Sequence, residues 1–145
     1  MEQFLIIQTA FIGDVILSTS VIEKIREHYP EAEIDFLLRK GNENLLQDNP
    51  HLRNLFILDK KNQKFRNVFR IIKTIRKNRY DYVINLQRFA TTGLITLFSR
   101  GKEKIGFDKN PLSLFYNRKI KHEIGTGEHE TERNLKTLEH LTGKG

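Results

Sequence analysis

Short apolar runs alternate along this chain with segments whose apolar residues recur at helical spacing. The runs at 3–8, 33–39, 54–59, 80–87 and 103–107 predict five strands buried on both faces of a parallel sheet. Helices are predicted in the intervening and final segments, at 14–29, 41–50, 60–79, 89–101 and 127–143. The segment 110–120 gives no clear pattern. This alternation predicts an α/β fold, a Rossmann-like parallel sheet with helices on both faces.

Ligands of such sheets bind at the carboxyl ends of the strands, where the strand order reverses. With the common order 3-2-1-4-5, this point lies between the first and fourth strands. The loops there read "TAFIGD" (9–14) and "NLQRFATT" (85–92). We therefore expect the functional residues in these two loops.

Asp14 has two interpretations. It can cap the following helix, because Asp is among the preferred N-cap residues. A carboxylate in a glycine-containing turn at the mouth of a parallel sheet can also accept a proton from a substrate hydroxyl. The pattern alone leaves both open.

Gln87 and Arg88 follow the fourth strand and also have two interpretations. They can cap the next helix. Alternatively, they face the same cleft as Asp14, where an arginine can bind a carboxylate or a phosphate.

Positive charge is concentrated in one segment. Residues 60–79 hold nine of the 25 Lys and Arg residues and no acid, although the whole chain has a net charge of +7. This helix presents either a solvated face, or a surface for anionic lipid, or, less favoured, one for nucleic acid. Phe65 and Phe69 fall on its apolar stripe with Val68, Ile72 and Ile75, so we expect both rings in the core rather than stacked on bases.

Composition narrows the function classes. The 145 residues fit one domain, contain no cysteine and include no apolar run long enough to span a bilayer, which favours the cytoplasm. G-x-G-x-x-G and P-loop motifs are absent, so a nucleotide held by either device is not expected. The histidines lack metal-ligand spacing, and we expect no metal.

Several stretches, in order, resemble the N-terminal domain of glycosyltransferase family 9, the ADP-heptose:lipopolysaccharide heptosyltransferases. They are "FLIIQTAFIGDVILSTSVIEKIREHYPEAEIDFLLRKG", "YDYVINLQ", "IGFDK", "LSLFYNRK" and "HETERNL". The likeness extends from Phe4 to about Leu141. Each stretch is weak alone, but the ordered set is specific.

The resemblance implies that residues 1–145 form the acceptor-side half of a two-domain GT-B enzyme. The half that binds the nucleotide sugar is absent from this chain, so the chain alone is expected to be inactive. The implied reaction is inverting and metal-independent, with no cofactor and with ADP-heptose or a similar nucleotide sugar as donor. Its acceptor is a lipid-linked, acidic or phosphorylated glycan, which places the enzyme in the cytoplasm, peripheral to the inner membrane.

The resemblance also assigns site residues. Asp14 matches the catalytic base, which favours catalysis over capping. The expected acceptor contacts follow the first, third, fourth and fifth strands: Thr9, Phe11, Ile12, Gly13, Lys60, Lys61, Lys64, Gln87, Arg88 and Lys109. Asn85 and Arg88 replace the acid and the glycine of the family's D-x-Q-G, which affects acceptor identity more than reaction class. The alternative is a non-catalytic, basic Rossmann-like module that binds nucleic acid or anionic lipid.

Overall fold

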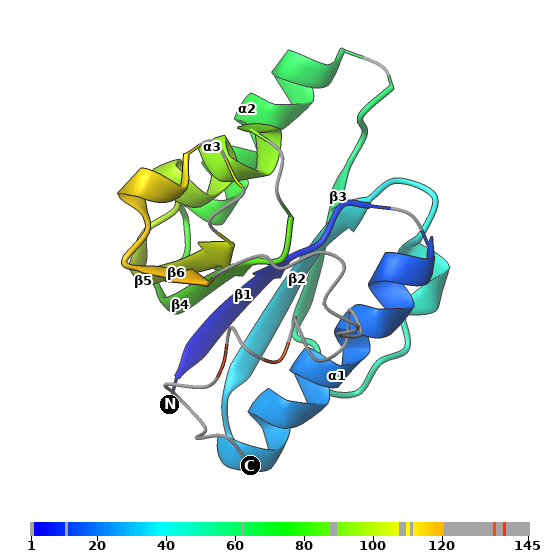
Figure 1. The fold of residues 1–145 in the computed structure, drawn as a ribbon. Coiled ribbons are helices and arrows are strands. Elements are labelled where there is room, and N and C mark those ends of the chain that lie inside the picture. Colours follow the sequence, from blue (N-terminus) through cyan, green and yellow to red (C-terminus); the bar gives the residue numbers. More distant parts are fainter. Residues whose placement is uncertain are drawn as a thin grey trace, which may run out of the picture.

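The computed structural model describes residues 2–10, 12–61, 63–87, 90–107, 110, 112–120, 135 and 138. Its centre is a six-stranded parallel sheet with the strand order β3-β2-β1-β4-β5-β6 (Figure 1). The strands are β1 (Gln3–Ile7), β2 (Glu33–Arg39), β3 (Asn54–Leu58), β4 (Tyr80–Asn85), β5 (Gly101–Phe107) and β6 (Arg118–Ile120). The predicted order 3-2-1-4-5 is confirmed, and the order reverses between β1 and β4.

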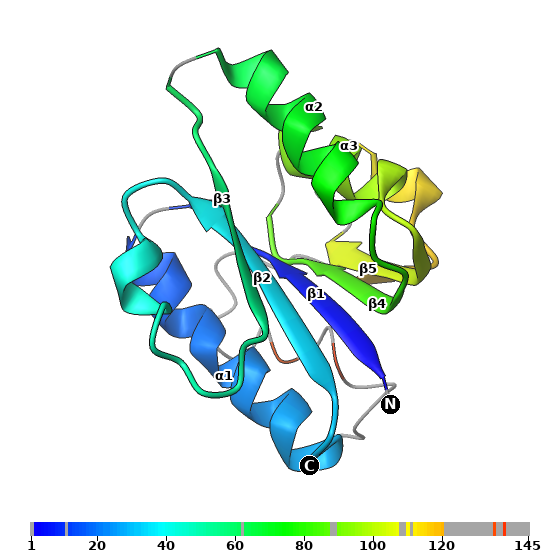
Figure 2. The ribbon, with the colours of Figure 1, turned by 180° about the vertical axis from the view of Figure 1, so that it is seen from behind.

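Helices cover both faces of the sheet. Helix α1 (Ile12–His28) lies on one face, and α2 (Lys64–Ile75) and α3 (Ala90–Phe98) lie on the other (Figures 1 and 2). Successive β1 side chains alternate between the two, so that Phe4 packs in the α1 core while Leu5 packs in the core beneath α2 and α3. This burial on both faces explains why the strands appear as continuous apolar runs.

Three details differ from the sequence prediction, and a fourth element cannot be compared with it. The unclear segment contains a short sixth strand, β6, and a 3-10 turn (Ser113–Phe115). The helix predicted at 41–50 is only a 3-10 turn (Glu43–Leu45). Gly101 does not end a helix but begins β5, where a Cβ atom would lie 2.6 Å from Cγ2 of Val83. The helix predicted at 127–143 lies outside the described residues except Leu135 and Leu138, the latter buried in the α1 core.

The burial of α2 also contradicts the sequence prediction. The helix buries Val68, Ile71 and Ile75, whereas Phe65 and Phe69 are 78% and 71% exposed. The N-terminal half of α2 rises above the ends of the strands in Figures 1 and 2, so its first turns have little sheet beneath them. The prediction that both rings lie in the core was therefore wrong.

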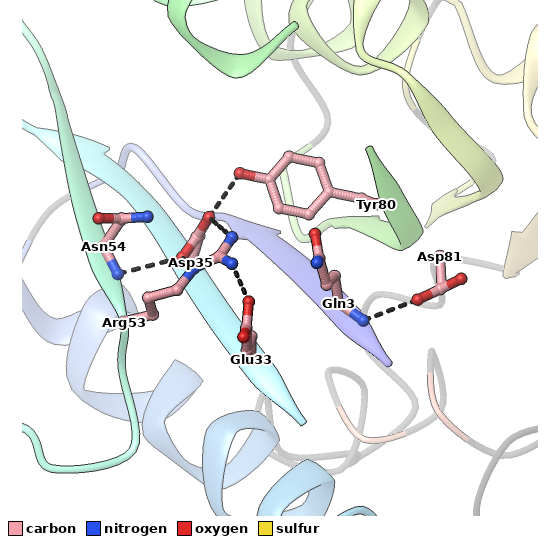
Figure 3. A network of polar contacts seen from close by, with 7 residues as sticks. All are labelled: Gln3, Glu33, Asp35, Arg53, Asn54, Tyr80 and Asp81. Carbon is pink, nitrogen blue, oxygen red and sulfur yellow. Dashed lines mark hydrogen bonds and ion pairs between the residues drawn. The ribbon is translucent and has the colours of Figure 1, made fainter. Parts of the chain in front are cut away.

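A partly buried polar network joins the amino ends of the strands, with Asp35 and Tyr80 buried at its centre (Figure 3). Asp35 of β2 accepts hydrogen bonds from Arg53, from the backbone N–H of Asn54 and from the Tyr80 hydroxyl of β4. Arg53 also pairs with Glu33. The network ties β2, β3 and β4 together at the edge opposite the predicted site.

In the part of the chain that the structure describes, no helix has the length and hydropathy needed to cross a membrane.

Candidate functional site

The carboxyl ends of β1 and β4 meet at the centre of one edge of the sheet, which we call the carboxyl edge. Ile7 of β1 is paired with Asn85 of β4, and each is the last residue of its strand. Gln8 and Thr9 continue from β1, and Gln87 follows β4; all three are buried. Polar side chains from both predicted loops therefore gather where the strand order reverses.

Thr9 and Gln87, two predicted acceptor contacts, lie together and bind each other. The Thr9 hydroxyl donates a hydrogen bond to Oε1 of Gln87 at 3.3 Å, and Nε2 of Gln87 donates to Oε1 of Gln8. Gln8 Oε1 also accepts a bond from the backbone N–H of Ala10 at 3.3 Å. These bonds fix the loop after β1 to the loop after β4. Gln8 was missed by the sequence analysis because it was counted as part of the first strand.

Asn85, the last residue of β4, is hydrogen-bonded both to the loop that follows it and to Tyr116, which precedes β6. Its Nδ2 donates to the Tyr116 hydroxyl at 3.1 Å, and its Oδ1 accepts the backbone N–H of Gln87 at 2.9 Å. Tyr116 reaches this position because residue 106 of β5 is a glycine: a Cβ atom there would lie 2.3 Å from the ring carbon Cε2 of Tyr116. Burial raises the pKa of the Tyr116 hydroxyl, so it is neutral near pH 7.

Asn110 holds the β4 loop from the other side. It is buried, and its Nδ2 donates to the carbonyl of Gln87 at 3.2 Å. Its Oδ1 accepts the backbone N–H of Leu112 at 3.0 Å. A Cβ atom on Gly93 of α3 would lie 2.5 Å from this oxygen, so the glycine makes the close approach possible.

Asp14 lies in the first turn of α1, next to this edge. The helix begins at Ile12, so Asp14 is its third residue and not the N-cap, and the capping interpretation does not fit this start. The side chain is partly exposed, and no hydrogen bond or ion pair joins its carboxylate to another described residue. Ile12 and Gly13 are exposed beside it. The carboxylate is thus accessible from solvent at the helix end that favours negative charge.

Lys60 brings positive charge to the same edge. Its Nζ donates a hydrogen bond to the carbonyl of Thr9 at 3.1 Å, across 51 residues of sequence. Burial lowers the pKa of Lys60, and the nearby charges of Arg39 and Lys64 lower it further. Arg39, Lys60 and Lys64 therefore form one cationic cluster, which suits an anionic group. Arg39 was missed, although its place at the end of the second predicted strand was a usable signal.

Other predicted residues are less closely joined to the site. Lys61 is exposed, and its backbone N–H donates to Oδ1 of Asp59 at 3.0 Å. No described contact links Lys61 to β1 or α1. Phe11, Arg88 and Lys109 lie outside the residues that the structure describes.

Asn42 is a further residue that the sequence analysis missed. Its Nδ2 donates to the carbonyl of Ala10 at 3.1 Å and so fixes the loop between β1 and α1 from the β2 side. It follows Gly41, whose φ of 111° belongs to a turn that favours glycine. The Gly-Asn pair after a strand was the available signal for this turn.

The described residues contain no group of three or more His, Cys, Asp or Glu side chains that could hold a metal ion. The carboxyl edge contains an accessible carboxylate, a cationic cluster and a set of buried polar side chains that are hydrogen-bonded to one another. Such an arrangement can accept a proton from a hydroxyl and can bind an anionic substrate.

Three comparisons with known proteins agree with one another. The sequence model of "Glycosyltransferase family 9 (heptosyltransferase)" matches residues 68–145. Lipopolysaccharide heptosyltransferase 3 of Escherichia coli (strain K12) is 33% identical over 138 residues, which cover 89% of this chain and 39% of that protein. The chain therefore spans well under half the length of this curated relative.

Solved structures show the same fold. A family 9 glycosyl transferase from Veillonella parvula DSM 2008 superposes with a TM-score of 0.88 at 22% identity, covering 97% of this chain and 41% of that one. The E. coli heptosyltransferase WaaC with ADP superposes with a TM-score of 0.80 at 20% identity, covering 97% of this chain and 48% of that one. At these identities the structures show a shared Rossmann-like architecture.

Proposed function

Because this chain belongs to glycosyltransferase family 9, the heptosyltransferase family, we propose that it is the acceptor-side domain of a sugar transferase. The proposed enzyme transfers a sugar from ADP-heptose or a similar ADP-sugar to the inner core of lipopolysaccharide. The names of the relatives support this substrate pair: they are lipopolysaccharide heptosyltransferases, and one solved relative holds ADP.

The observation that carries the proposal is the placement of Asp14. A partly exposed carboxylate without a described partner stands in the first turn of α1, where the strand order of a parallel sheet reverses. A structural carboxylate is more often engaged, as Asp35 is in this protein. A carboxylate that is positioned but left accessible suits a general base.

In the proposed reaction, Asp14 takes the proton of an acceptor hydroxyl. The acceptor oxygen attacks the anomeric carbon of the donor from the face opposite ADP. The new C–O bond forms as the bond to the diphosphate breaks, and ADP leaves with the electron pair. One displacement inverts the anomeric configuration, and the step is proposed to need no metal ion and no cofactor. The domain contributes by holding base and hydroxyl in line.

The cationic cluster has a separate role in this proposal. Lys60 and Arg39 at the carboxyl edge, with Lys64 at the start of α2, bind phosphate or carboxylate groups of the acceptor. Thr9 and Gln87 bind each other, so they act mainly by fixing the loops around the acceptor, with Ile12 and Gly13 beside Asp14. Phe11, Lys61, Arg88 and Lys109 remain predicted contacts.

We propose that residues 1–145 constitute one acceptor-side domain of a GT-B enzyme. The relatives are more than twice as long as the matched segment, which supports a second, donor-binding domain outside this chain. Both substrates must meet between the two domains, so the chain alone is proposed to be inactive. The lipid-linked acceptor would place the enzyme in the cytoplasm, peripheral to the inner membrane.

The test is transfer by the full-length protein from ADP-heptose to an inner-core acceptor. Asp14→Asn keeps the size of the side chain but removes the base, and we expect transfer to fall by about 10²- to 10⁴-fold. The matched control is Asp48→Asn, an exposed carboxylate in the turn after Leu46, which should retain full activity. Melting temperature and ADP-sugar binding should be unchanged in both variants.

Near-normal transfer by Asp14→Asn would refute the assignment of the base. If the full-length protein transferred no sugar from any of a panel of ADP- and UDP-sugars, the proposal that it is a glycosyltransferase would be refuted. The non-catalytic binding module would then be the better description.

A further inference from the structure

Helix α2 exposes two large apolar rings to solvent. Phe65 and Phe69 are 78% and 71% exposed, the highest values among the exposed large hydrophobic residues of the described chain. They are four residues apart, so their side chains are neighbours on successive turns of one helix face. Two adjacent exposed aromatic rings are costly in water unless something covers them.

Positively charged side chains lie beside this pair. Arg66, Arg70 and Lys73 of α2 are all exposed. From Lys60 to Arg79 the sequence contains no Asp or Glu. The exposed face of α2 therefore carries two apolar rings along one side and cations beside them, and the helix contains no acid.

Exposed apolar residues also occur on the neighbouring helix α3. The two helices lie side by side on one face of the sheet (Figures 1 and 2), and Nη1 of Arg76 donates to the carbonyl of Phe98 at 2.8 Å where they end. Leu94 and Phe98 of α3 are 41% and 51% exposed. No acid lies within α3 either.

We propose that this face docks on an anionic lipid bilayer, with Phe65 and Phe69 inserted among the lipids. Arg66, Arg70 and Lys73 would then contact lipid phosphates beside the inserted rings. Apolar rings combined with flanking cations are the features by which interfacial helices bind anionic membranes. The face adjoins the cationic cluster at Lys64, but lipid binding requires neither the donor nor Asp14.

A bilayer fits this face better than two other occupants. Nucleic-acid binding uses aromatic platforms in a groove, whereas Phe65 and Phe69 lie on the exposed side of a single helix. A protein surface covering the rings would also remove water from Arg66 and Lys73, and it would have to supply a matching acid for each cation. Lipid headgroups leave those cations hydrated and paired with phosphate.

The test is binding of the full-length protein to vesicles of phosphatidylethanolamine and phosphatidylglycerol, measured by flotation. The double variant Phe65→Ser, Phe69→Ser should bind about tenfold more weakly or worse, because its insertion energy is lost. The matched control is Leu45→Ser, which removes an exposed apolar side chain from the 3-10 turn after β2. It should bind like the unmodified protein.

The charges are tested separately with Arg66→Gln, Lys73→Gln. This variant should bind the anionic vesicles more weakly than the unmodified protein does. The binding that remains should depend less on salt concentration. Binding of the unmodified protein to vesicles of phosphatidylcholine alone should be weak.

Insertion itself can be observed with Phe69→Trp, because residues 1–145 contain no tryptophan. Added anionic vesicles should shift the emission of this variant to the blue, and brominated lipids should quench it, relative to the parent protein. Equal vesicle binding by the Phe65→Ser, Phe69→Ser protein, or an emission that vesicles do not change, would overturn the proposal. So would Phe-dependent binding to a single-stranded oligonucleotide without vesicle binding.

Membrane docking and sugar transfer are separable in these experiments. The phenylalanine variants should still transfer sugar to a delipidated, soluble acceptor. Asp14→Asn should bind vesicles normally.

Discussion

The hydroxyl of Tyr80 donates a 2.6 Å hydrogen bond to Oδ2 of Asp35, which links β4 to β2 across the intervening strand β1 (Figure 3). Asp35 is fully buried, and it also accepts bonds from Arg53 Nε and Nη2 at 3.0 and 2.8 Å. Burial raises the pKa of Tyr80, and its bond to Asp35 raises it further, so the phenol stays protonated and donating.

Tyr80→Phe should destabilise the protein by about 1–3 kcal/mol, because a buried carboxylate loses a donor that no water replaces. The matched control is Tyr82→Phe on the same strand, whose hydroxyl has no hydrogen bond to another described residue. The control should cost less than about 0.5 kcal/mol. Urea unfolding of both variants measures the difference. Equal losses would show that the bond across β1 contributes nothing.

Alanine should have opposite effects at two glycines. Gly106→Ala places a Cβ atom 2.3 Å from Cε2 of Tyr116, and we expect a loss of about 1–3 kcal/mol as the ring is displaced. Gly13→Ala meets no atom within 4 Å and lies within α1, so it should leave stability unchanged or raise it by up to about 1 kcal/mol. Thermal unfolding compares them. A stable Gly106→Ala protein would contradict the close packing of Tyr116 on β5.

Which face of α2 packs on the sheet can be tested by shortening one side chain on each face of the helix. Ile71 is buried beneath the helix, so Ile71→Ala should cost about 2 kcal/mol or more. Phe69→Ala removes a larger side chain but should cost less than about 0.5 kcal/mol, because the ring is 71% exposed. Chemical denaturation of the two variants distinguishes the faces. The reverse order of losses would restore the sequence-based prediction.

Acceptor binding should depend on pH through Lys60. Its pKa lies below the ordinary value of 10.5, so rising pH removes its charge earlier than that of an exposed lysine. In the full-length protein, KM for a phosphorylated acceptor should therefore increase with rising pH already below the pH at which an exposed lysine loses its charge. Lys60→Arg keeps its charge throughout this range and should flatten the increase.

The control for this pH profile is Lys102→Arg, an exposed cation at the start of β5, on the opposite edge of the sheet. It should reproduce the unmodified profile. If Lys60→Arg also did so, the cationic cluster would have no part in acceptor binding.

The sheet was predictable because the side chains on both faces of each central strand are buried. Such a strand needs an unbroken apolar run, which is visible in the sequence without knowledge of the tertiary structure. The expected strand order places Asp14 and Gln87 at the same edge of the sheet, and this placement is confirmed. The exact start of α1 was not predictable, because Asp14 is compatible with both a cap and the first helical turn.

The buried face of α2 was ambiguous for a different reason. The helix carries two overlapping apolar stripes, one with Phe65 and Phe69 and the other with Val68 and Ile71. Periodicity gives the angle between stripes but not which one meets the sheet. The decision depends on how the helix lies against β3 and α3, whereas the spacing placed Phe65 and Phe69 on one stripe with Val68.

Local patterns and an ordered set of motifs were sufficient to predict the fold class, the family and the carboxylate at the reversal point, and the strand order followed from the commonest arrangement of such sheets. The folded chain was needed to learn that Lys60 reaches Thr9, that Tyr116 and Asn110 hold the β4 loop, and that Phe65 and Phe69 face solvent. Those contacts join residues far apart in the chain or depend on how a helix is seated, and hydrophobic spacing contains neither kind of information.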